Sequence, residues 1–206
     1  MSPDLILLLA DRIGVFVFAI SGGILAVRKD MDLLGVITLA FLPAIGGGTL
    51  RDLILDQEVF WLPDPSVLLL AIAGGVTAFL FHSLVENFRP LRWADAFGMA
   101  LFAVTGAAKA MALGHGFLVI LIMGAMTASA GGLMRDVVAN EDPLLLKTDI
   151  YATAALLAGL VYYGLVRLGA PELAAFGAGI AAGFILRGLA IIYGLSLPKP
   201  PRARGD

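Results

Sequence analysis

Seven long apolar runs divide this chain, and they limit the possible folds more than any other feature of the sequence. A helix needs about 20 apolar residues to cross the hydrocarbon core of a bilayer. The connections between the runs are short, so neighbouring helices must be antiparallel. We therefore predict an all-α integral membrane protein with seven transmembrane helices. They are expected at residues 5–27, 33–55, 66–84, 94–113, 117–139, 148–168 and 173–195.

The composition agrees with this prediction and argues against several functions. Of the 206 residues, 60% are hydrophobic and 15% are charged, which leaves little polar surface for a water-soluble domain. The net charge of -2 provides no basic face for nucleic acid, so no nucleic-acid partner is expected. The chain has no cysteine, and its two histidines, His82 and His115, lie far apart, so we expect no metal site and no cofactor. Neither a GxSxG elbow nor a P-loop is present, and we expect no enzymatic activity.

The basic residues of the connections predict the orientation of the chain. Cytoplasmic loops of membrane proteins are enriched in Lys and Arg. All but one of the basic residues in the predicted connections fall on one side, and the exception is Arg167. We predict a multi-pass protein of the cell inner (plasma) membrane, with its N-terminus outside and its C-terminus in the cytoplasm. The residues on the predicted cytoplasmic side are Arg28, Lys29, Arg89, Arg92, Lys147, Lys199, Arg202 and Arg204.

The first half of the chain is repeated in the second half. A shift of 84 positions aligns the two halves without a gap. FAISG at residues 18–22 returns as FAVTG at 102–106, and GGGTLRD at 46–52 returns as AGGLMRD at 130–136. This agreement predicts two copies of one three-helix unit.

An odd number of crossings in each copy inverts the second copy relative to the first. Inverted repeats with glycine-interrupted helices indicate a solute pathway near the bilayer midplane, at the interface of the repeats. We predict two inverted three-helix repeats plus a seventh helix. The expected boundaries are 1–84 for the first repeat, 85–168 for the second, 169–197 for the seventh helix and 198–206 for a basic cytoplasmic tail.

Glycines near the middle of the second and fifth predicted helices are candidates for this pathway. They allow a kink, which would free backbone carbonyls, or a close contact between helices. Nearby Ser and Thr hydroxyls could line a polar path, or bond back to the carbonyl four residues earlier. The candidate pore-lining or kink residues are Ser21, Gly46, Gly47, Gly48, Thr49, Thr105, Ser129, Gly131 and Gly132.

Charged residues lie inside the predicted helices, where each costs roughly 2.5 to 3.5 kcal/mol near the bilayer centre. Arg51 and Arg135 are each followed by an aspartate, Asp52 and Asp136. The inversion places Asp11 with Arg51 toward the outside and Asp95 with Arg135 toward the cytoplasm. We predict ion pairs or near pairs, Asp11 with Arg51 and Asp95 with Arg135. They clamp the first helix of each repeat to the second, line the pore, or do both.

Two further basic residues have no equivalent in the repeat. Lys109 aligns with Leu25, and it could reach the membrane interface, bind a lipid phosphate or act as a gate. Arg187 lies in the seventh predicted helix, where a snorkelling or lipid-contacting side chain is expected.

The doubled GGGTLRD and AGGLMRD segments, each preceded by FAISG or FAVTG, resemble the prokaryotic branch of the trimeric intracellular cation (TRIC) channels. The resemblance covers residues 11 to about 195. It implies a homotrimer of seven-helix protomers, each with its own cation pore kinked at the glycines. It also implies a monovalent cation channel, permeable to potassium, with potassium or sodium as permeant ions and membrane lipids, including a bound phospholipid, as partners.

Two other functions remain open at this point. Related bacterial proteins with the same doubled domain are regarded as small amino acid transporters, so a glycine secondary transporter is the main alternative. A structural membrane protein with ion-paired clamps and no transport activity is the third.

Overall fold

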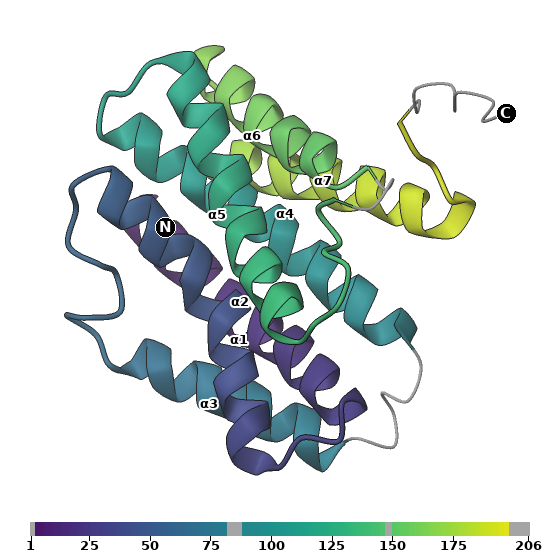
Figure 1. Cartoon of the computed structure of the whole chain (residues 1–206). Coiled ribbons are helices and arrows are strands. Elements are labelled where there is room, and N and C mark those ends of the chain that lie inside the picture. Colours follow the sequence, from purple (N-terminus) through teal and green to yellow (C-terminus); the bar gives the residue numbers. More distant parts are fainter. Residues whose placement is uncertain (1–2, 82–87, 147–149, 198–206) are drawn as a thin grey trace, which may run out of the picture.

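The computed structural model describes residues 3–81, 88–146 and 150–197, and these residues form seven α-helices (Figure 1). The predicted all-α fold is confirmed, and each helix matches one predicted helix. The helices are α1 (Pro3–Arg28), α2 (Leu33–Ile54), α3 (Ser66–Leu80), α4 (Phe88–Ala112), α5 (Phe117–Val138), α6 (Ala152–Arg167) and α7 (Glu172–Tyr193).

The largest difference from the predicted bounds is at the start of α4. This helix begins at Phe88 rather than at residue 94. The charged stretch that predicted a connection is its first turns, because Pro90 falls in the first turn, where the missing N–H costs no hydrogen bond. Some predictions fall outside the described residues. They are the predicted end of the third helix at 82–84, the predicted start of the sixth helix at 148, His82, and the predicted tail 198–206.

Four helices, α1, α2, α5 and α7, contain 22-residue stretches long and apolar enough to cross a membrane. The third helix of each repeat, α3 or α6, is also apolar but has only 15 or 16 residues. Large apolar side chains point outward, as at Leu34, Leu80 and Leu118, which are 71%, 66% and 69% exposed. Apolar surface of this extent suits contact with lipid tails.

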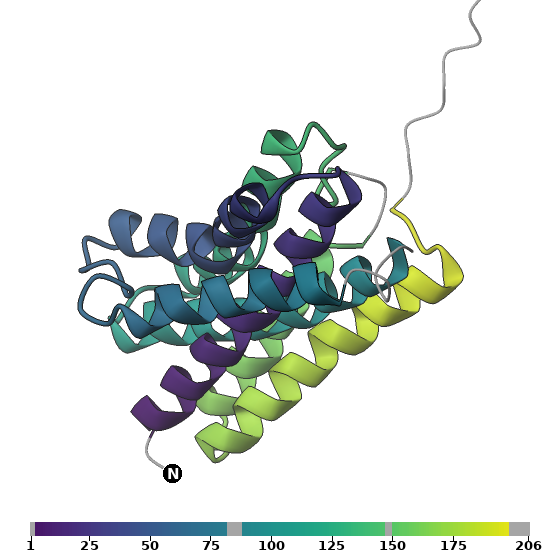
Figure 2. The same cartoon turned by 90° about the horizontal axis from the view of Figure 1, so that it is seen from below.

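The helix outside the duplication, α7, packs on α4 and α6 and lies at the edge of the bundle in both views (Figures 1 and 2). In Figure 2 the first turns of α1 and α7 lie at the same end of the molecule. This is the arrangement expected when neighbouring helices alternate in direction.

The two repeats meet along α1 and α4 through a reciprocal contact. A Cβ atom added to Gly14 would lie 2.7 Å from the ring of Phe102, and one added to Gly98 would lie 2.6 Å from the ring of Phe18. The two rings pack against each other with their centroids 5.1 Å apart. Because both pairs of residues are 84 positions apart, the contact is the same when the repeats are exchanged.

Candidate functional site

The middle of the molecule is a close crossing of α2 and α5. A Cβ atom at Gly47 would lie 2.0 Å from the carbonyl oxygen of Thr127, and one at Gly131 would lie 2.7 Å from the carbonyl oxygen of Pro43. Gly131 and Thr127 follow Gly47 and Pro43 by 84 positions, so this contact also occurs twice. Glycine is needed here because backbone meets backbone.

Both helices continue through their glycines without interruption. The predicted close contact between helices is therefore observed at Gly47 and Gly131. The residue in α2 that removes a backbone hydrogen bond is Pro43, one turn earlier, because its nitrogen has no hydrogen. Pro43 lies inside a predicted helix but is not among the predicted kink residues.

On one side of this crossing lies the Arg135 cluster, which consists of Ser21, Asp95, Arg135, Asp136 and Tyr151. The Arg135 side chain is fully buried, and its Nη1 donates to Asp95 Oδ1 at 2.8 Å and to the hydroxyl of Ser21. Its Nε donates to Asp136 Oδ1, also at 2.8 Å. The predicted Asp95–Arg135 pair is confirmed, and it joins α5 to α4 and, through Ser21, to α1.

Tyr151 and Arg187 extend this cluster toward α7. The Tyr151 hydroxyl interacts with the Asp95 carboxylate and donates to the carbonyl oxygen of Ala128 at 3.3 Å. The Arg187 guanidinium lies over the Tyr151 ring, 5.1 Å from its centroid, and the whole residue is buried. The expected lipid-facing position of Arg187 is therefore wrong. Tyr151 is not among the predicted site residues. Its counterpart in the first repeat is the apolar Val67, so the comparison of the repeats does not mark it as a polar position.

On the other side of the crossing lies the Arg51 cluster, which consists of Asp11, Arg51, Asp52, Thr105 and Lys109. Arg51 Nε donates to Asp52 Oδ1 at 2.7 Å, and Lys109 Nζ donates to the same oxygen at 2.8 Å. The other Asp52 oxygen accepts the N–H of Phe60 at 3.0 Å. The Phe60 ring packs against Arg51, with the guanidinium carbon 5.7 Å from its centroid.

Of the two predicted arrangements, an ion pair or a near pair, Asp11 and Arg51 form the near pair. Among the ion pairs of residues 3–81, 88–146 and 150–197, Arg51 is joined to Asp52, and none joins it to Asp11. Asp11 remains within electrostatic range of Arg51 and Lys109. Two residues break the symmetry, because Lys109 and Phe60 stand where the repeat has Leu25 and Leu144. Lys109 adds a second positive charge at Asp52, and the Phe60 ring packs against the Arg51 guanidinium.

The four candidate hydroxyls have different partners. Thr49 donates to the Ile45 carbonyl at 2.7 Å and accepts from Trp61 Nε1 at 2.9 Å. Ser129 donates to the Ala125 carbonyl at 2.7 Å. Thr49 and Ser129 therefore bond to the carbonyl four residues earlier, which was one of the two predicted arrangements. Ser21 contacts Arg135 instead. Thr105 is fully buried, and its hydroxyl contacts the Asp11 carboxyl.

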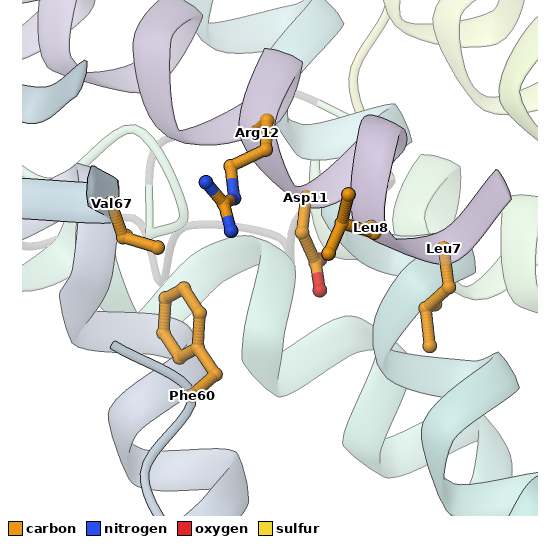
Figure 3. Close-up of a pocket in the computed structure, with 6 residues that line it drawn as sticks. All are labelled: Leu7, Leu8, Asp11, Arg12, Phe60 and Val67. Carbon is orange, nitrogen blue, oxygen red and sulfur yellow. The ribbon is translucent and has the colours of Figure 1, made fainter. Parts of the chain in front are cut away.

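A cavity of about 220 Å³ borders the Arg51 cluster. Figure 3 shows Asp11 and Arg12 next to each other on α1, with Phe60 and Val67 facing them. Lys109 is also partly accessible, with 24% of its side chain exposed. In contrast, Arg135 and Asp95 are 0% and 1% exposed. The Arg51 cluster is therefore the more accessible of the two.

Arg12 connects the rim of this cavity to the α2–α3 loop by donating to Asp64 and Ser66. The Ser66 hydroxyl and the Arg12 guanidinium lower the pKa of the Asp64 carboxyl below its ordinary value. A carboxylate with a lowered folded-state pKa stabilises the fold above its unfolded pKa, near 3.9, and this contribution is lost as the pH falls through the folded pKa.

We expect acid to remove this contribution selectively. Between about pH 6 and pH 3, the melting temperature of the wild type in detergent should fall more than that of Asp64→Asn, which has no carboxylate to protonate. The difference between the two proteins should be largest near neutral pH and shrink in acid. A pH-independent difference would contradict this role for Asp64.

Sequence comparison with known proteins finds relatives that cover most of this chain. A family model described as a glycine transporter matches residues 8–83 and again residues 92–167. The two matches start 84 positions apart, as the repeat does. The UPF0126 inner membrane protein YadS of Escherichia coli (strain K12) is 40% identical over 198 residues, which cover 91% of this chain and 93% of YadS. A UPF0126 membrane protein of Vibrio cholerae is 38% identical over 199 residues, or 94% of this chain and 82% of that protein.

Solved structures share the fold of this chain. A TRIC trimeric intracellular cation channel orthologue from Rhodobacter sphaeroides has a TM-score of 0.89 and 40% identity, covering 92% of this chain and 99% of that chain. A prokaryotic TRIC channel in 0.5 M KCl has a TM-score of 0.86 and 31% identity, covering 94% and 99%. A third structure, solved to explain conductance through TRIC cation channels, has a TM-score of 0.83 and 35% identity over the full length of both chains.

Proposed function

The chain belongs to the prokaryotic TRIC family of membrane proteins, and on this premise we propose that it is a monovalent cation channel, permeable to potassium. The observation that carries the proposal is the pair of charge clusters on either side of the α2–α5 crossing. Arg51, Asp52, Asp95, Arg135 and Asp136 are all buried inside a membrane bundle. Ionisable residues at such positions face the bundle interior and mark ion pathways, because placing them in lipid is costly.

We place the pathway within the protomer. It would begin at the cavity beside Asp11, pass the Arg51 cluster and the α2–α5 crossing, and continue to the Arg135 cluster. Carboxylates along such a path favour cations over anions. Potassium or sodium ions would be the permeants.

The same family membership supports proposals about assembly and location. The related Rhodobacter sphaeroides channel is described as trimeric, and we propose a homotrimer for this chain. The related Escherichia coli protein is named an inner membrane protein, and we propose that location here, with the N-terminus outside and the C-terminus in the cytoplasm. Membrane lipids, including a bound phospholipid, are the other proposed partners, and we propose no cofactor and no catalytic role.

A glycine secondary transporter is the second candidate function. The family model that matches both repeats carries that description, which favours this alternative. In a carrier, the inverted repeats would rock between outward and inward states around a central substrate site. Transport would then saturate with glycine, whereas channel flux would follow the potassium gradient without an amino acid.

Flux through purified protein in liposomes tests these alternatives. A potassium gradient is applied with and without glycine on one side. Potassium flux that needs no glycine supports the channel. Saturable glycine uptake without potassium flux would instead establish the carrier.

Substitutions at Gly132 test, in the same assay, whether the ion path passes the Arg135 cluster. A Cβ atom there would lie 3.5 Å from Asp95 Oδ1, 3.7 Å from the Tyr151 hydroxyl and 3.8 Å from Arg135 Nη2, which are ordinary contact distances. Gly132→Ala should therefore fold and conduct. Gly132→Leu should lower potassium flux by about tenfold or more, because its side chain fills the space at the Arg135 cluster. Unchanged flux in a folded Gly132→Leu protein would show that the path does not pass this cluster.

A further inference from the structure

The two clusters contain the same carboxylate and hydroxyl pair, but only one pair holds a cation. In the Arg135 cluster, Nη1 of Arg135 bonds both the Asp95 carboxylate and the Ser21 hydroxyl. The counterparts of Asp95 and Ser21 by the 84-residue shift are Asp11 and Thr105. The Arg51 cluster thus has the same two oxygen ligands on α1 and α4, with the roles of the two helices exchanged.

No protein cation is bonded to the Asp11 and Thr105 pair in the described part of the chain. Arg51 Nε and Lys109 Nζ both bond Asp52 instead. The fully buried Thr105 hydroxyl contacts the Asp11 carboxyl instead of a basic side chain. A buried carboxylate with a neutral hydroxyl as its contact lacks a bonded countercharge, which a bound cation would supply.

Asp11 also lies where an incoming ion would reach it. It lines the cavity of about 220 Å³ in which Figure 3 shows it beside Arg12. Arg12 is bonded to Asp64 and Ser66, so its charge is already paired on the loop side of the cavity. The remaining lining is apolar, which leaves Asp11 as the carboxylate of this cavity.

We propose that Asp11 and Thr105 bind a partly hydrated monovalent metal cation, in the position that the Arg135 guanidinium takes between Asp95 and Ser21. Carboxylate and hydroxyl oxygens are suitable ligands for hard cations. The nearby positive charges of Arg51 and Lys109 weaken the binding, which lets a permeant ion leave again. This inference rests on the proposed function, because it treats the bound cation as the permeant ion.

Binding is tested on purified protein in detergent, without any measurement of flux. Thermal unfolding is followed while KCl replaces choline chloride at constant ionic strength. A cation that binds only the folded protein raises the melting temperature with its concentration. The wild type should show this rise, and crystals grown with thallium(I) in place of potassium should show an anomalous peak between Asp11 and Thr105.

Two substitutions at one buried position separate the hydroxyl from packing. Thr105→Val keeps the shape and loses the hydroxyl, whereas Thr105→Ser keeps the hydroxyl. The apparent potassium affinity should fall about tenfold in Thr105→Val, since one contact to a charged group is lost, and should be close to wild type in Thr105→Ser. No potassium dependence in the wild type, no thallium peak, or equal affinity in wild type and Thr105→Val would each overturn the inference.

The outcomes for this site and for the channel are distinguishable. Potassium binding that depends on Thr105 in a protein without potassium flux would support the site and reject the channel. Normal flux in a protein whose stability shows no potassium dependence would reject the site and leave the channel.

Discussion

Replacing Arg135 with methionine is expected to destabilise the folded protein by about 3–5 kcal/mol, because removing one partner of a buried ion pair leaves uncompensated charge. Both Asp95 and Asp136 bond this guanidinium, and the three side chains are at most 5% exposed. The free energy of unfolding is measured by titration with a denaturing detergent. The loss should appear in protein that still inserts into the membrane.

Arg51→Met is the matched variant, and its effect should be smaller, at about 1.5–3 kcal/mol. Lys109 remains bonded to Asp52 after this change, so the most deeply buried carboxylate of the Arg51 cluster keeps a cation. Adding Lys109→Met should bring the loss to the level of Arg135→Met. Equal destabilisation by the two single arginine variants would contradict this role for Lys109.

Gly47→Ala is expected to lower the free energy of unfolding by about 1–3 kcal/mol, because overpacking between two backbones cannot be relieved by a side-chain movement. The new Cβ atom would lie 2.0 Å from the Thr127 carbonyl oxygen, so α2 and α5 must separate. The same detergent titration measures the loss. A larger residue such as leucine would disturb folding as well as flux, so Gly132 is the better position for testing the pathway.

Gly177→Ala is the control for this substitution. Gly177 lies in α7, and a Cβ atom there meets nothing within 4 Å. Alanine should be neutral or stabilise the helix by up to about 1 kcal/mol through its higher helix propensity. If Gly47→Ala were as stable as Gly177→Ala, the close contact of α2 with α5 would not limit stability.

The arrangement of the helices could be predicted from the sequence because the repeat determines how the two halves are oriented relative to each other. Three crossings in each copy force an inversion, and the apolar runs bound most helices to within a few residues. The start of α4 could not be found in this way, because Arg89 and Arg92 have the charge pattern of a connection although they lie in helical turns.

The Arg135 cluster could be predicted in part, and the Arg51 cluster to a smaller extent. A strict symmetry argument gives one carboxylate partner to each arginine, which holds for Asp95 and Arg135. Asp11 and Arg51 form only a near pair, because Arg51 bonds Asp52 together with Lys109, which has no basic counterpart in the repeat. The burial of Arg187 could have been inferred, because Arg187 continues the four-residue spacing of Gly179 and Gly183, which pack against α6.

The reciprocal contact between α1 and α4 bears on how such a protein could arise. Gly14 and Phe18 lie one helical turn apart, as do Gly98 and Phe102, so a single helix carries both the projection and the hollow that receives it. Such a helix is complementary to an upside-down copy of itself. A separate three-helix polypeptide inserted into the membrane in both orientations could therefore form this interface as an antiparallel homodimer. Gene fusion would add the connection without requiring a new contact.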